Sequence, residues 1–480
     1  MRSGRLRTEQ DIHLDVFLND VHTKTPYGLQ RKLERSWYTP ELTQELEFEF
    51  DQVDYFLKEL QKNPQTMSDL GGILSHLKEV KGSVLRARAG DVLDEVELFE
   101  IKQFGIFTEK VVSFMREHCP DYNVLSWFDF SGLLKLLDPA GENLSTFYIY
   151  GAYSEKLVRL RKEKEKIEAT LFSEEHAEDK EELLQRRREV LVFIEEEEYA
   201  IRNDLSRHIK EISKGFFICM DSLSKLDHWL AKAEISHRLN CSRPVLTKQV
   251  GWQFKGLRNP HLKKILESSG GSYQPLDLTL HAGTTLLSGA NMGGKTMTLK
   301  TFFLGVSLVQ MGYFPPCDQA EGNLFDRCEF IGTDEQDVLR GLSSFAAEMT
   351  SLKELMEIDS KLLKLVVLDE PARGTNPHEA VAILKVIAKH FHEDSSMLFL
   401  SSHYNDIATP DMNHLQVKGI SDVDFTSVDL GHDPVSRIQS HMDYSVHPVS
   451  FKKKVPEEAV KIMELLDFDK DTLDAIKKQL

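Results

Sequence analysis

Hydrophobic side chains recur every three or four positions through the first part of the chain. The stretches QELEFEFDQVDYFLKELQ (residues 44–61) and TEKVVSFMREHC (residues 108–119) follow this period, which is that of one buried helix face. Turn-forming residues interrupt it at KTPYG, KNPQ, SDLGG and LDPAGEN. We therefore predict a helical domain over residues 1–153, with breaks at these four stretches.

Between residues 154 and 214 the composition changes to Glu, Lys, Arg and Leu, which predicts a long helical hairpin. Its predicted turn is SEEHAED, residues 173–179, which lacks spaced apolar residues. The basic clusters RLRKEKEK (159–166) and QRRR (185–188) stand equally far from that turn, so antiparallel pairing brings them to the same height. They form either a solvated surface of alternating charge or a band that attracts phosphate. Acidic residues outnumber basic ones over the whole segment.

Apolar residues form short continuous runs after about residue 245: LDLTL, TTLLS, LKLVVL and SMLFLSS. Stretches with helical spacing, MTLKTFFLGVSLVQM and PHEAVAILKVIAKHF, lie between them. This alternation predicts a mostly parallel α/β sheet in a domain over residues 249–480. Residues 215–248 are predicted to form a helix that returns from the hairpin to this domain.

The charge of the chain is strongly acidic, with 77 acidic against 59 basic residues and a net charge of −18. This balance opposes a protein that simply coats nucleic acid, although a local basic strip could still hold DNA. The 5 cysteines include no C-x-x-C pair, which favours a reduced cytosol over a disulfide or zinc framework. The opening MRSGRLRTEQ is charged, and the sequence contains no run of 18 apolar residues. We therefore expect neither a signal peptide nor a membrane span. A cytoplasmic location is expected.

A phosphate-binding loop is predicted where the strand TTLLS meets the helix that follows it. The segment GANMGGKT fits G-x-x-x-x-G-K-[ST] without a mismatch. Its glycines let backbone N–H groups turn toward phosphates, its lysine reaches the β and γ phosphates, and its threonine hydroxyl meets Mg²⁺. The predicted nucleotide-binding residues are Gly289, Ala290, Asn291, Met292, Gly293, Gly294, Lys295 and Thr296.

Two acids, Asp369 and Glu370, directly follow the apolar run LKLVVL. In a phosphate-binding fold the first acid orients the Mg²⁺ shell and the second polarises the attacking water. Together with the loop, they make hydrolysis of ATP the favoured chemistry. His403, in LFLSSHY, ends the next predicted strand; a contact with the γ phosphate and a purely structural role both remain open for it.

Taken together, these motifs resemble those of the MutS mismatch-repair ATPases. SGANMGGKT resembles the G-P-N-M-G-G-K-[ST] loop, LDEPARGTNP resembles D-E-x-x-R-G-T, and SSHY resembles T-H-Y. IGTDEQDVLRGLSSFAAEM is similar to the segment between them, and NDVHTKTPYGLQRKLERSWYTP more loosely to the family's core. The resemblance implies an ABC-type P-loop ATPase domain with a C-terminal helical dimerisation segment, preceded by an all-α core and lever domain that carries a helical-hairpin clamp.

The resemblance also implies roles for single residues. Lys295 and Thr296 would bind phosphate and Mg²⁺, Asp369 would bind Mg²⁺, and Glu370 would be the catalytic base. His403 would sense the γ phosphate, and Ser343 in GLSSF would reach the nucleotide of a partner subunit, which implies a homodimer. The implied adenine contacts are Tyr273, Gln274 and, from DYSV, Tyr444.

Departures from the family leave two functions open. No segment resembles the N-terminal domain that reads mismatches, its connector or a nuclease-like tail, so direct mismatch recognition is not expected. One reading is a DNA clamp of repair or recombination. DEPARGTNP, however, is closer to short MutS-like proteins found beside cobalamin-dependent aminomutases, which implies an ATPase that reactivates a protein client. A transporter or chromosome-maintenance ATPase is disfavoured because GLSSF lacks the double glycine of L-S-G-G-Q.

Overall fold

The computed structural model forms two compact units. Unit 1 comprises Met1–His22, Arg35–Lys58 and Lys232–Leu480, and unit 2 comprises Thr23–Glu34 and Glu59–Ala231. The domain boundaries drawn from the sequence stay predictions. The structure describes residues 12–141, 149–171, 180–268, 272–289, 294–332, 344–357, 359–393, 396–420, 442–453, 460, 463 and 468–478.

Unit 2 is built from helices. They are α3 Pro26–Glu34, α5 Pro64–Leu74, α6 Lys81–Ala89, α7 Glu95–His118, α8 Ser131–Leu137, η2 Gly151–Tyr153, α9 Glu155–Leu171, α10 Lys180–Glu211 and most of α11 Ser213–Arg238. The predicted break at SDLGG is wrong, because these residues lie inside α5. Burial of Met67, Leu70 and Leu74 on one face of α5 outweighs the cost of about 1 kcal/mol for each helical glycine.

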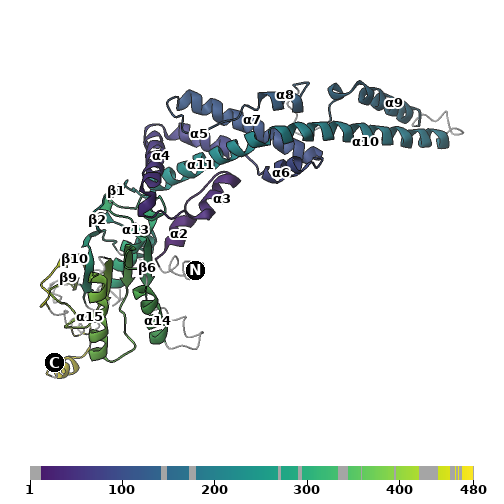
Figure 1. Ribbon diagram of the computed structural model, residues 1–480. Coiled ribbons are helices and arrows are strands. Elements are labelled where there is room, and N and C mark those ends of the chain that lie inside the picture. The colour runs from purple at the N-terminus through teal and green to yellow at the C-terminus, as the bar shows by residue number, and fades with distance from the viewer. Residues whose placement is uncertain are drawn as a thin grey trace. The chain divides into compact units, whose positions relative to one another are not determined.

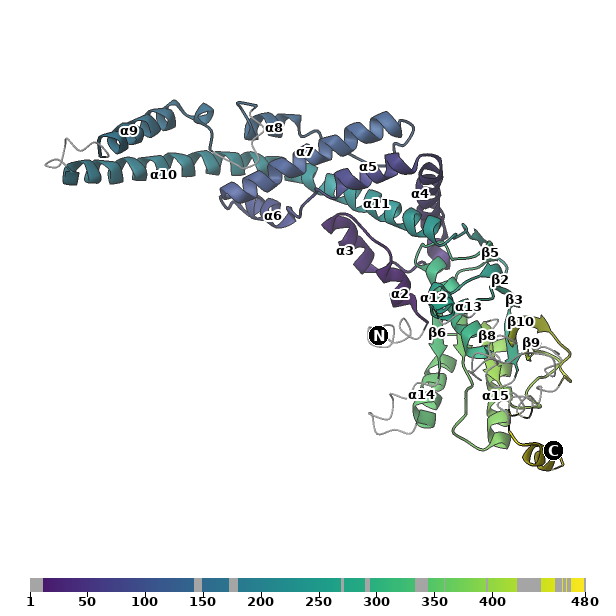
Figure 2. The ribbon, with the colours of Figure 1, turned by 180° about the vertical axis from the view of Figure 1, so that it is seen from behind.

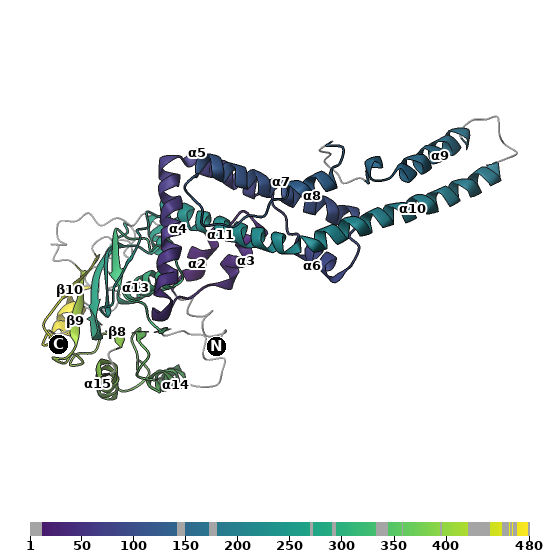
Figure 3. The same cartoon turned by 45° about the horizontal axis from the view of Figure 1, so that its top comes forward.

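Helices α9 and α10 lie side by side where the hairpin is predicted (Figures 1 and 3). The turn predicted at residues 173–179 lies outside the described residues. Buried side chains between the two helices include Leu157, Ile167, Val190 and Ile194. These apolar contacts explain why a segment so rich in charge still packs as a helix pair.

Ion pairs fix the register of α9 against α10. Arg186 lies 2.8 Å from Glu163, and Arg187 lies 2.8 Å from Glu168. The two basic clusters therefore stand at the same height, as predicted. The structure adds that two of the three arginines in QRRR are already paired with carboxylates of the facing helix.

A buried carboxylate anchors the start of α3. Asp227 accepts hydrogen bonds from the Thr25 amide at 2.7 Å, the Thr25 hydroxyl at 2.6 Å and the Lys24 amide at 2.8 Å. A Cβ on Gly28 would stand 2.1 Å from an oxygen of Asp227. This close approach gives a physical reason for the threonine and the glycine in TKTPYG.

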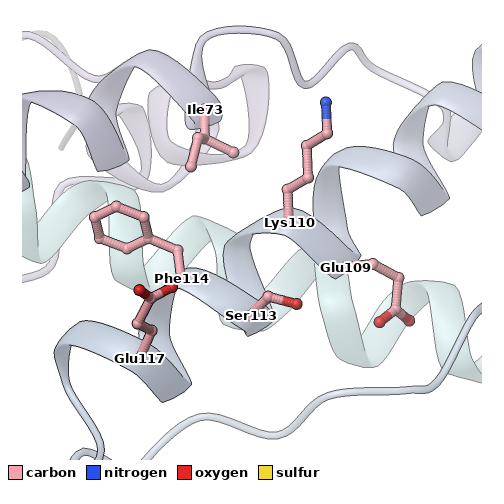
Figure 4. Close-up of a pocket in the computed structure, with 6 residues that line it drawn as sticks. All are labelled: Ile73, Glu109, Lys110, Ser113, Phe114 and Glu117. Atoms are coloured by element: carbon pink, nitrogen blue, oxygen red, sulfur yellow. The ribbon is translucent and has the colours of Figure 1, made fainter.

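A pocket of about 360 Å³ opens between α5 and α7. Figure 4 shows Ile73 of α5 facing the ring of Phe114 of α7. Glu109, Lys110, Ser113 and Glu117 complete the lining. This lining brings together no group of metal ligands.

A six-stranded sheet forms the centre of unit 1, in the order β10-β9-β4-β8-β7-β6. All neighbours are parallel except β9 and β10, so the predicted parallel sheet is confirmed. Its strands are β4 Gly283–Ser288, β6 Arg327–Ile331, β7 Lys364–Leu368, β8 Met397–Ser402, β9 Asn413–Ile420 and β10 Met442–Pro448.

The run LDLTL is a strand, but it belongs to a second sheet. That sheet has the order β1-β5-β2-β3, with strands β1 Val245–Leu246, β2 Gly251–Leu257, β3 Leu276–His281 and β5 Gln319–Gly322. Strand β3 pairs antiparallel with β2. Its side chains alternate between buried and exposed, whereas β4, β7 and β8 are buried throughout. This alternation is typical of a sheet with one solvated face.

Helices cover both faces of the six-stranded sheet (Figure 2). Phe302 of α13 Lys295–Gln310 packs on Phe399 of β8, with ring centroids 5.5 Å apart. Leu398 and Leu400 point to the other face, where α14 Ser344–Met356 and α15 Pro377–Glu393 pack. Burial on both faces accounts for the continuous apolar runs in the sequence.

The remaining helices of the described chain are α2 Leu14–Asn19, η1 Pro40–Leu42, α4 Thr43–Lys62, α12 Pro260–Ser268 and α18 Lys470–Lys477. Each helix in the described ranges is either too short or too polar to span a lipid bilayer.

Candidate functional site

The phosphate-loop prediction falls between β4 and α13, at the carboxyl end of a central strand. Gly289 and Gly294 have φ angles of 154° and 83°, which favour glycine over other residues. Lys295 opens α13, is 4% exposed, and donates a hydrogen bond of 2.8 Å to the carbonyl of Gly289. Thr296 lies in the same first turn. Ala290, Asn291, Met292 and Gly293 lie outside the described residues.

The two predicted acids follow β7 at the same edge of the sheet. Asp369 is 6% exposed, and its Oδ1 accepts a hydrogen bond of 2.8 Å from the hydroxyl of Ser401 on β8. The same hydroxyl accepts a hydrogen bond of 2.9 Å from the amide of Glu370. The chain then turns sharply, with φ of 46° at Glu370 and 61° at Ala372, a region that non-glycine residues rarely adopt.

Three basic side chains surround the carboxylate of Glu370. Lys295 Nζ lies 3.2 Å and His403 Nδ1 3.5 Å from its Oε1, and Arg373 Nε lies 3.4 Å from its Oε2. The structure therefore brings Lys295, Asp369, Glu370 and His403 together, although they come from three separate segments of the chain.

The electrostatics of this cluster suit an anionic ligand. Burial lowers the pKa of Lys295, and the neighbouring Glu370 acts in the opposite direction. His403 Nδ1 is buried and makes no hydrogen bond within the described chain, because 3.5 Å is too long for one of good geometry. A buried ring nitrogen and a buried ammonium that face the same carboxylate have capacity for phosphate oxygens.

The predicted adenine contacts separate into two places. Gln274 accepts a hydrogen bond of 2.9 Å from the amide of Tyr444, and the ring of Tyr444 would lie 2.5 Å from a Cβ on Gly294. These two residues therefore lie beside the end of the phosphate loop. Tyr273 differs, since its hydroxyl accepts a hydrogen bond of 2.8 Å from the amide of Asn259 and is also hydrogen-bonded to the side chain of Thr301.

The oxygens at this edge fit Mg²⁺. This ion takes hard oxygen ligands and usually combines one or two protein side chains with phosphate oxygens and water. Asp369 and Thr296 supply such oxygens. The described residues include no cluster of three or more His, Cys, Asp and Glu side chains that could enclose a metal ion. A cation bound here would therefore depend on these two side chains together with the oxygens of a nucleotide.

Sequence reasoning missed three residues of the cluster. Arg373 contacts Glu370, Ser401 contacts both acids, and Glu348 of α14 accepts a hydrogen bond of 2.9 Å from the amide of Ala372. A hydroxyl inside the apolar run LFLSS could have drawn attention to Ser401. No comparable local signal marks Glu348. The predicted Ser343 lies outside the described residues.

Comparisons with known proteins agree with this geometry. Residues 285–462 match the family model of MutS domain V. The chain is 31% identical over 221 residues to an endonuclease MutS2 of Finegoldia magna, which covers 44% of this chain and 27% of that protein. It is 30% identical over 190 residues to a DNA mismatch repair protein MutS of Symbiobacterium thermophilum, which covers 39% of this chain and 21% of that protein.

These alignments span only about a quarter of each relative's length, so they identify the shared domain and leave the activity of the whole chain to be proposed. The match over residues 285–462 includes the acids after β7 and the histidine after β8. Residues 285–462 match MutS domain V, the ATPase domain of that family, and the chain therefore carries a MutS-type ATPase domain.

Proposed function

We propose that this chain is a MutS-type switch that hydrolyses ATP with Mg²⁺ and thereby controls its grip on DNA in repair or recombination. The observation that carries the proposal is the convergence of Lys295, Asp369, Glu370 and His403 at one edge of the sheet. Lys295 neutralises phosphate charge, His403 contacts the γ phosphate, and Asp369 with Thr296 holds Mg²⁺. Glu370 polarises the water that attacks the γ phosphorus.

A nucleotide phosphate can bind Lys295 only if the carboxylate of Glu370 gives up its contact with this lysine. Lys295 Nζ is shared between the Gly289 carbonyl at 2.8 Å and Glu370 Oε1 at 3.2 Å. An entering phosphate takes over this ammonium group and leaves the carboxylate free to accept a proton from water. The release of Glu370 from Lys295 couples nucleotide binding to the turn at residues 370–372. A conformational switch needs such a coupling.

The proposed DNA contact is one face of α9. Arg159, Lys162 and Lys166 are exposed, and a spacing of three and four residues places them on one side of a helix. Among the described residues, no carboxylate forms an ion pair with any of the three. Arg186 and Arg187, by contrast, are held by Glu163 and Glu168. We therefore propose that the hairpin over residues 154–214 clamps DNA through α9 more than through QRRR.

Charge reversal tests this contact. Arg159→Glu, Lys162→Glu or Lys166→Glu should weaken DNA binding and lower the salt slope of log K by about 0.9 per lost phosphate contact. Lys164→Glu is the matched control, because Lys164 lies on the opposite side of the same helix and should change binding much less. Equal losses in all four variants would reject a specific role for this face.

We also propose that the working form is a homodimer in which Ser343 of one subunit reaches the nucleotide of the other. Support comes from the resemblance of GLSSF to the family segment that does so. Mixing Ser343→Ala with Lys295→Ala subunits should leave at most one intact composite site per dimer. Wild-type ATPase activity in the mixed dimer would argue against a site shared between subunits.

A second candidate is an ATPase that remodels a protein client, such as a cobalamin-dependent aminomutase. One observation favours it: the described helices α9 and α10 carry acidic and basic side chains in equal number, and several of these pair with each other. Such a surface offers little net attraction for DNA. ATP hydrolysis without DNA binding at low salt would favour this candidate.

A further inference from the structure

The turn that carries Glu370 holds backbone strain. Glu370 has φ of 46° and Ala372 has φ of 61°, and each such residue costs of the order of 1–3 kcal/mol unless its surroundings hold it in place. The carboxylate direction of Glu370 depends on this turn, because the backbone angles of Glu370 itself set where its side chain projects.

The first group that holds the turn is the Ser401 hydroxyl of β8. It donates to Asp369 Oδ1 at 2.8 Å and accepts from the Glu370 amide at 2.9 Å. Ser401 is fully buried, so no water competes for either bond. One hydroxyl thus fixes the side chain of the first acid and the backbone of the second.

The second group is Glu348 of α14. Its Oε1 accepts a hydrogen bond of 2.9 Å from the amide of Ala372, the other residue of positive φ. The backbone comes close to α14 at a second point, since a Cβ on Gly374 would stand 3.3 Å from the Cβ of Phe345. Burial raises the pKa of Glu348, and the hydrogen bond from Ala372 acts against this shift.

We propose that Ser401 and Glu348 are positioning residues for ATP hydrolysis, which hold the strained turn from its two sides and so aim the Glu370 carboxylate. This inference rests on the proposed ATPase function. Neither residue contacts the reacting atoms, and both act through Glu370. Substitution of either residue should therefore lower kcat and leave nucleotide affinity nearly unchanged.

The proposal gives α14 a role beyond packing. This helix starts at Ser344, directly after Ser343 in the sequence. Glu348 stands in the second turn of α14 and bonds the backbone beside the proposed base. A displacement of α14 would therefore change the turn at Ala372, which provides a physical route from α14 to the orientation of Glu370.

Paired substitutions in the 480-residue chain test the two contacts. Glu348→Ala removes the acceptor for the Ala372 amide, whereas Glu348→Gln keeps an oxygen in its place. Ser401→Ala removes the bridging hydroxyl, whereas Ser401→Thr keeps it. Glu354→Ala is the control, because Glu354 is an exposed acid of the same helix α14.

Three quantities are measured for each variant: kcat for ATP, Kd for a non-hydrolysable ATP analogue, and Tm. The two alanine variants should lose roughly 10- to 100-fold in kcat, as is typical of a misplaced catalytic group, with Kd within about three-fold of wild type. Glu348→Gln and Ser401→Thr should recover most of the rate, and Glu354→Ala should match wild type.

Two outcomes would overturn the inference. The first is an unchanged kcat in both alanine variants. The second is a parallel loss of kcat, analogue affinity and Tm that the conservative variants do not rescue, which would assign these residues to stability alone. Failure of the proposed function is a separate result, since it appears as a wild-type protein that binds the analogue but does not hydrolyse ATP.

Discussion

The ion pair between Lys295 and Glu370 leads to a prediction that concerns binding as well as catalysis. Glu370→Gln should abolish most ATP turnover, because an amide cannot accept the proton of the attacking water. It should also tighten nucleotide binding. Lys295 Nζ lies 3.2 Å from Glu370 Oε1, and a bound phosphate has to separate the two groups.

The expected gain in nucleotide affinity depends on how deeply the ion pair between Lys295 and Glu370 is buried. The side chains of Lys295 and Glu370 are only 4% and 11% exposed. A hydrogen bond to a charged group contributes about 1.5–3 kcal/mol, and a tenfold change in Kd corresponds to about 1.4 kcal/mol. The amide oxygen of glutamine can form only a weaker, uncharged acceptor contact with Lys295, so the substitution should remove about 1–2 kcal/mol of this competing interaction. Glu370→Gln should therefore bind a non-hydrolysable ATP analogue roughly 5- to 30-fold more tightly than wild type.

The assay is a titration of purified protein with the analogue and, separately, with adenosine. Adenosine lacks phosphates and should show no tightening, because it does not draw Lys295 away from Glu370. Glu354→Gln, at an exposed position of α14, serves as the charge-matched control. Equal or weaker analogue binding by Glu370→Gln would refute the competition between phosphate and Glu370 for Lys295.

The other predictions concern how the chain folds. Gly28→Ala should destabilise unit 2 by about 1–3 kcal/mol, because its Cβ would stand 2.1 Å from Asp227. Unfolding in urea measures the loss of stability. An unchanged midpoint would contradict the close contact between residue 28 and Asp227. Lys232→Met should cost about 3–5 kcal/mol by leaving Glu49 buried without its partner at 2.5 Å. Adding Glu49→Leu should restore most of that stability, and a double variant no more stable than the single one would contradict the buried charge of Glu49 as the cause of the loss.

Local patterns in the sequence predict much of unit 1. The strands TTLLS, LKLVVL and SMLFLSS and the helices between them lie where their apolar runs indicate. The error at LDLTL arose because composition alone suggested one sheet. The alternation of leucine with Asp277 and Thr279 was available in the sequence and distinguishes the second sheet.

Contacts between distant segments could not be predicted. The glycines of SDLGG stay helical because α5 buries one face in unit 2, which turn propensity does not reveal. The arginines of QRRR are paired across the hairpin, and only the register of α9 against α10 shows this. Glu348 is 24 residues away from Ala372 in the chain and Ser401 is 31 residues away from Glu370, so no local motif includes either contact.

The most direct test of the proposed switch is DNA binding by the purified 480-residue chain, measured with and without a non-hydrolysable ATP analogue. Labelled homoduplex, mismatched duplex and four-way-junction DNA are compared at low and physiological salt. The proposed switch predicts salt-sensitive binding that changes with nucleotide and weakens in Lys162→Glu. A protein that hydrolyses ATP but binds none of these DNAs at low salt would contradict the DNA clamp and support action on a protein client.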